Sequence, residues 1–117
     1  MLLIAASILI ILGVLHSVLG EKFILIRLFR RDNLPKIYGS DAFTKGTMRF
    51  AWHITSIAWF GFASLLFMHS EGSSENILYV VSLVFLLSAA LSAYFTKGKH
   101  FSWWLFLAVA ILSYLSI

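Results

Sequence analysis

The chain has 117 residues, of which 61% are hydrophobic and only 12% are charged. A soluble domain of this length would leave much of that apolar surface in water, so the composition favours one membrane domain over residues 1–117. The sequence contains no cysteine, which excludes disulfides, thiol nucleophiles and cysteine-based metal sites. Membrane topology accounts for the net charge of +4, so we expect no nucleic-acid partner.

The first apolar run covers residues 1–20 and is long enough to cross the hydrocarbon core. It has no basic region before its apolar part, so we expect a retained helix and not a cleaved signal peptide. One face of this helix carries small residues, which predicts close approach of a second helix: Ala6, Gly13, Ser17 and Gly20. His16 lies beside that face and is therefore expected to contact protein.

Residues 21–31 mix apolar and basic positions, which is typical of an interfacial segment near anionic headgroups. We expect this stretch to extend the first helix or to lie along the cytoplasmic membrane surface. Arg27, Arg30 and Arg31 are its candidate lipid or anion contacts. The apolar side chains left to meet acyl chains are Phe23, Leu25, Ile26 and Phe29. Pro35 ends the segment, because the residue before proline avoids helix.

Three further apolar runs follow, and each predicts a membrane-spanning helix: residues 47–68, 77–95 and 100–117. Residues 36–46 are polar and predict a loop, with a short helix that begins near Ser40 or Asp41, which are both good N-caps. The third run has small residues on one helical face, which indicates a second packing surface. The last run has about 18 residues, just enough to span.

The cationic side chains are segregated along the chain. All nine Lys and Arg residues lie in or beside the first and third connections, and residues 69–76 contain none. The positive-inside rule then places both basic connections in the cytoplasm of a bacterial-type inner (plasma) membrane, with both termini outside. The predicted fold class is all-α: an antiparallel bundle of four transmembrane helices, with a cytoplasmic basic interfacial segment between the first two.

This topology brings three histidines and one carboxylate near the same membrane face. His16, His53, His100 and Glu21 are therefore candidate ligands of a divalent metal, and two of the histidines can also ligate haem. The favoured interpretation is simpler: these histidines form interhelical or interfacial hydrogen bonds. Arg49 shares a helical face with His53, at a spacing of four residues.

Glu21 and Arg49 admit two interpretations. They form an ion pair or anion site near His53, or, as we favour, they extend separately to the headgroups. The aromatic side chains of the second span, such as Trp52 and Trp59, either line a quinone or lipid cleft or, in the favoured interpretation, pack and anchor the helix.

The sequence supports three hypotheses of function and does not decide whether the protein is an enzyme. The preferred one is a binding or accessory protein that has a cytoplasmic-side cluster of His, Glu and Arg and contacts membrane lipids or a partner membrane subunit. The second is a metal- or haem-dependent redox or hydrolytic protein that uses His16, His53 and Glu21. The third is a small transporter or channel that acts as a homodimer, although no carboxylate lies at mid-membrane depth in the predicted spans.

Overall fold

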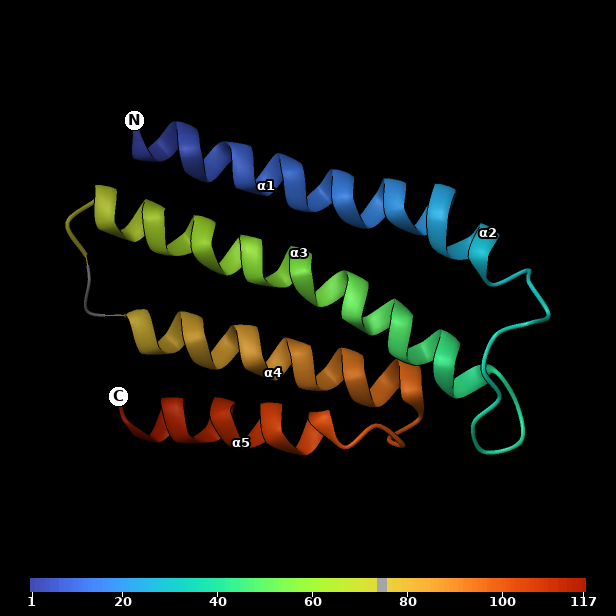
Figure 1. Cartoon of the computed structure of the whole chain (residues 1–117). Coiled ribbons are helices and arrows are strands. Elements are labelled where there is room, and N and C mark those ends of the chain that lie inside the picture. Colours follow the sequence, from blue (N-terminus) through green and yellow to red (C-terminus); the bar gives the residue numbers. More distant parts are fainter. Residues whose placement is uncertain (74–75) are drawn as a thin grey trace.

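The computed structural model of the chain describes residues 1–73 and 76–117, and every element in them is helical. The elements are α1 (Leu2–Leu19), a π-helical turn η1 (Gly20–Leu25), α2 (Ile26–Leu28), α3 (Ala42–Ser70), α4 (Ile77–Thr96) and α5 (Ser102–Leu115) (Figure 1). Three helical stretches are long and apolar enough to cross a membrane: Leu2–Leu28, α3 and α4. The predicted all-helical class is therefore confirmed, and three helices have the length and apolar composition of membrane spans.

The fourth predicted span is shorter than expected. Helix α5 has 14 residues, or about 21 Å at 1.5 Å of rise per residue. That length is below the roughly 30 Å of a bilayer core, so α5 alone does not have the length of a spanning helix. The residues on either side, at 100–101 and 116–117, are outside the helix.

The helices lie side by side in chain order, as a single layer (Figure 1). Within the described residues α1 contacts α3, α3 contacts α4 and α4 contacts α5, and helices that are not neighbours in this order make no contact. The Cα atoms extend over 51 × 32 × 13 Å, which fits four helices in a row. The predicted bundle is therefore not confirmed, because α1 and α5 lie at opposite edges of the layer and do not contact each other.

The small residues of α1 face α3, as the sequence predicted. Ala6, Gly13 and Gly20 are buried, and the bulky aliphatic residues of the other α1 faces are exposed. Phe60 of α3 lies directly against Gly13, where a Cβ would meet its ring at 2.5 Å. The absence of side chains at these positions allows the two helices to approach closely.

Helix α3 begins five residues before the predicted span, at Ala42, with Asp41 as its N-cap residue. The predicted short helix near Asp41 is therefore the first turns of α3, and the prediction of a separate polar loop up to residue 46 is wrong. Gly46 explains the difference. It is buried, and a Cβ there would overlap the backbone carbonyl of Phe95, so the first turns of α3 pack against the end of α4.

Helices α4 and α5 are joined by serine hydroxyls, which satisfies polar groups inside an apolar seam. Ser82 Oγ donates to the Ala110 carbonyl at 2.8 Å, and Ser92 Oγ lies 2.8 Å from Ser102 Oγ. Ser92 is fully buried. The small-residue face predicted for the third span is thus a packing face.

The two ends of the layer differ in charge. The connections before α3 and between α4 and α5 lie at one end, and both chain termini and the α3–α4 connection lie at the other (Figure 1). All nine Lys and Arg residues lie in or next to two connections, the one before α3 and the one between α4 and α5. The fold therefore separates a basic end from an end without Lys or Arg.

Candidate functional site

Five polar side chains connect α1 and η1 to α3 near the basic end. We call this set the α1–α3 polar cluster; it consists of Ser17, Glu21, Arg49, His53 and Ser56. Arg49 contacts both carboxylate oxygens of Glu21, through Nη2 at 2.6 Å and Nε at 3.2 Å. His53 Nε2 lies 3.0 Å from Glu21 Oε2. The structure therefore shows the ion pair, and the favoured interpretation, in which Glu21 and Arg49 extend separately to the headgroups, is wrong.

The cluster continues toward the middle of the helices through two hydroxyls. His53 Nδ1 lies 2.9 Å from Ser17 Oγ, and Ser17 Oγ donates to Ser56 Oγ at 2.8 Å. Ser56, which is only 2% exposed, donates to the Gly13 carbonyl at 2.8 Å. The result is an unbroken hydrogen-bonded chain from Arg49 to the backbone of Gly13, inside the α1–α3 seam.

Two acceptors fix the direction of the bonds at the ends of this chain. The Gly13 carbonyl only accepts, so Ser56 donates to it and its oxygen is available to accept from Ser17. The Glu21 carboxylate also accepts, so His53 Nε2 is the donor in that contact.

His16 and Trp52 form a reciprocal contact next to this cluster. Their rings stack with centroids 4.6 Å apart and planes within 3°. Trp52 Nε1 donates to the His16 carbonyl at 2.9 Å, and His16 Nε2 lies 3.3 Å from the Trp52 carbonyl. Gly20 allows this geometry, because a side chain there would overlap the Trp52 indole. Trp59 completes the contact with its ring edge-on to His16, 4.9 Å away.

The predicted metal site is not confirmed. Among the described residues, no group of three or more His, Asp and Glu side chains is placed to hold a metal ion. His53 and Glu21 do meet, but Arg49 and Ser17 occupy their remaining polar atoms. His16 is turned to Trp52. His100 lies on the other side of α3, where Nδ1 contacts Ser102 Oγ at 2.8 Å and the ring contacts phenylalanines.

The predicted lipid contacts separate into two groups. Arg27 lies over the ring of Phe23, 5.6 Å away, and Arg30 and Arg31 are exposed beyond the end of α2. Arg49, by contrast, belongs to the α1–α3 polar cluster. The prediction that Leu25 contacts acyl chains is wrong, because this side chain is buried and only 2% exposed.

Phe29 was also predicted to contact acyl chains, but its ring instead packs against the Arg49 guanidinium. The Arg49 guanidinium is 4.9 Å from the Phe29 ring centroid. This contact ties the end of α2 to α3. Residues 21–28 continue the first helix, which is one of the two arrangements that the sequence left open.

Sequence reasoning missed the hydroxyls and the stacked tryptophan. A signal was present: Arg49, Trp52, His53 and Ser56 follow the i, i+3, i+4, i+7 spacing of one helical face. The π-helical turn, by contrast, has no local sequence signature beyond Gly20. Glu21 lies within this turn, and such turns are frequent at functional sites.

The order Glu21–His53–Ser17 has the connectivity of a carboxylate, a base and a nucleophile. Ser17 nevertheless lies inside α1, where backbone N–H groups bond within the helix, and its oxygen already contacts Ser56. Acyl transfer requires donors aimed at a developing oxyanion, and a helix interior does not supply them. We therefore assign the cluster a structural role: its hydrogen bonds and ion pair hold α1 against α3.

No protein-family model, curated protein or solved structure matches this chain.

Proposed function

We propose that the protein is a small binding protein of the inner membrane, whose basic end lies in the cytoplasm and binds anionic lipid headgroups. Segregation of all nine Lys and Arg residues at one end of the layer is the observation that carries this proposal. The positive-inside rule orients that end toward the cytoplasm, with both termini outside. This orientation requires that the region of α5 cross the membrane together with residues beside it.

The basic end is held in place by specific contacts, which orientation alone would not require. Thr44 Oγ1 donates to the Pro35 carbonyl at 2.8 Å, and the backbone N–H of Ile37 donates to the Ser40 carbonyl at 3.0 Å. Lys99 lies over the Tyr38 ring, 5.1 Å from its centroid. The positive-inside rule requires only that Lys and Arg be present near the membrane. Contacts that also hold the basic end in one conformation lower the entropic cost of binding an anionic headgroup.

Within this surface, residues 22–31 form the part most suited to lipid; we call them the basic segment. Phe23 and Ile26 are 47% and 42% exposed, beside the exposed Arg27 and Arg30. Apolar and cationic side chains at the same depth match an acyl chain and an anionic headgroup. The α1–α3 polar cluster supports the segment, because Glu21 fixes Arg49 and Arg49 in turn contacts Phe29.

The experiment is native mass spectrometry of the protein from nanodiscs that contain phosphatidylglycerol or phosphatidylcholine. The wild type is expected to retain phosphatidylglycerol preferentially. Replacing Arg27, Arg30 and Arg31 together by Gln should reduce that retention at least tenfold, since each cation near an anionic surface contributes about 1 kcal/mol.

A control of equal charge change separates recognition from bulk electrostatics. Lys36, Lys45 and Lys97 are replaced by Gln, which removes three cations outside the basic segment. This control should lose clearly less phosphatidylglycerol than the arginine variant. Equal losses in the two variants would contradict recognition by the basic segment and leave only bulk attraction to the basic end. No preference in the wild type would contradict lipid binding and leave the charges only a topological role.

A further inference from the structure

An apolar groove lies on the surface between α1, η1 and α3, next to the α1–α3 polar cluster. We call it the α1–α3 groove. It is open to the surface and has a volume of about 330 Å³, and His16 is its one titratable lining residue. The other lining residues are aliphatic or aromatic apart from Gly20, and they include Phe23, Trp52 and Trp59. Its volume is in the lower part of the range of small-molecule sites, which are typically about 300–1,000 Å³.

The contact with Trp52 determines which nitrogen of His16 carries hydrogen. His16 Nε2 lies 3.3 Å from the Trp52 carbonyl, and a carbonyl oxygen can only accept. Nε2 is therefore the donor. In the neutral imidazole Nδ1 then carries a lone pair, and no donor among the described residues bonds to it. Nδ1 is not among the buried atoms that lack a partner, so it is accessible to a ligand in the groove that can supply a donor.

Aromatic surfaces surround this acceptor. The Trp52 indole stacks on one face of the imidazole, and Trp59 meets its edge at 4.9 Å. Phe23 lines the groove from η1. Flat aromatic walls with one hydrogen-bond acceptor fit a planar ring that carries a hydroxyl, since the ring packs against the walls and the O–H bonds to the imidazole.

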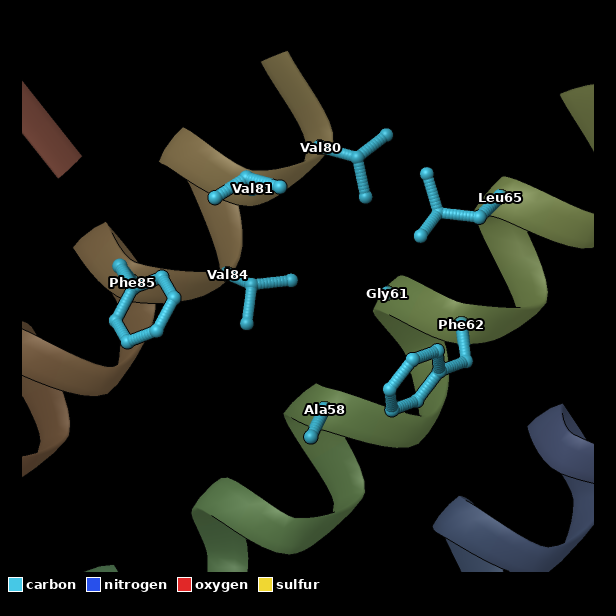
Figure 2. Close-up of a pocket in the computed structure, with 8 residues that line it drawn as sticks. All are labelled: Ala58, Gly61, Phe62, Leu65, Val80, Val81, Val84 and Phe85. Carbon is cyan, nitrogen blue, oxygen red and sulfur yellow. The ribbon is translucent and has the colours of Figure 1, made fainter. Parts of the chain in front are cut away.

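We infer that the α1–α3 groove binds a membrane-soluble hydroxy-aromatic molecule of the hydroquinone type, whose hydroxyl donates to His16 Nδ1. This inference is independent of lipid binding at the basic end. A second groove of the fold provides the comparison. It lies between α3 and α4 beside Gly61, and all of its lining residues are apolar (Figure 2). That groove offers no side chain that can accept a hydrogen bond.

The test compares two probes, decyl hydroquinone and its dimethyl ether, which has the same ring but no O–H. Binding is followed by quenching of tryptophan fluorescence in nanodiscs, in a background with Trp103 and Trp104 replaced by Phe. The wild-type groove should bind the hydroquinone at least about fivefold more tightly than the ether, as expected for one hydrogen bond of about 1 kcal/mol. His16→Phe keeps a ring to stack on Trp52 and should abolish that preference.

A second pair of variants tests the groove without touching His16. Leu15 lines the α1–α3 groove and is 46% exposed, so Leu15→Trp should fill the groove and weaken hydroquinone binding at least tenfold. Leu65 lines the α3–α4 groove, and Leu65→Trp should leave binding unchanged. Equal binding of both probes by the wild type, or full binding by Leu15→Trp, would overturn the inference. Equal affinity would identify a non-specific apolar groove for acyl chains.

Discussion

Replacement of Glu21 by Gln tests whether the α1–α3 polar cluster holds the first helix to the third. The carboxylate accepts from Arg49 at 2.6 and 3.2 Å and from His53 at 3.0 Å. Gln keeps one acceptor but removes the charge, and it leaves the Arg49 cation without a carboxylate. Breaking a fully buried pair costs about 3–5 kcal/mol. Because the Glu21 and Arg49 side chains are 30% and 29% exposed, solvent screening reduces the expected loss to about 2 kcal/mol.

The pair between Asp41 and Lys45 is the matched control for Glu21→Gln. Its side chains are 26% and 30% exposed, but it joins residues four apart within one helical turn, where a pair contributes about 0.3–0.5 kcal/mol. Asp41→Asn should therefore lower the free energy of unfolding much less. The assay is reversible unfolding in mixed micelles, combined with a double-mutant cycle of Glu21→Gln and Arg49→Gln.

The coupling energy in that cycle should be about 1–2 kcal/mol, as for side chains in one network. A coupling near zero, with Glu21→Gln no more destabilising than Asp41→Asn, would refute the reasoning. Glu21 and Arg49 would then be two surface charges that lie close together without stabilising the contact between α1 and α3.

Two further predictions concern packing and the histidines. Gly46→Ala should lower the free energy of unfolding by about 2 kcal/mol or more, because its Cβ would overlap the rigid backbone carbonyl of Phe95. Gly61→Ala should cost less in the same unfolding assay, since its Cβ would meet only a valine methyl at 2.5 Å, and a result in the reverse order would contradict this packing. His16→Ala and His53→Ala should each lower the thermal unfolding temperature more than His69→Ala. Equal and negligible shifts for all three would show that the α1–α3 contacts contribute little.

The sequence predicts much of the helical content, because apolar run length is a direct consequence of bilayer thickness. It also predicts the packing face of the first helix, where Gly13 and Gly20 are spaced by seven residues. It does not predict the single layer, since small faces determine which neighbours pack but not how two such seams are angled around α3. The start of α3 was missed for a similar reason: the close contact of Gly46 with Phe95 is a tertiary property.

At the candidate site, helical spacing identified the pair Arg49 and His53, and membrane depth brought Glu21 near them. Depth alone cannot separate the two sides of a helix. His100 was therefore grouped with His16, although α3 lies between them. Ser17 and Ser56 form a hydrogen bond because α1 and α3 lie close enough for the two hydroxyls to meet. No pattern in a single sequence encodes that interhelical distance.

Sidedness of the two ends is the claim on which lipid binding depends most directly, and the cysteine-free sequence makes it simple to measure. Single cysteines are introduced at Asn33, in the basic connection, and at Ser73, in the connection without Lys or Arg. Intact cells are then treated with a membrane-impermeant maleimide before and after permeabilisation. We expect position 73 to be labelled in intact cells and position 33 only after permeabilisation. Labelling of position 33 in intact cells would contradict this sidedness.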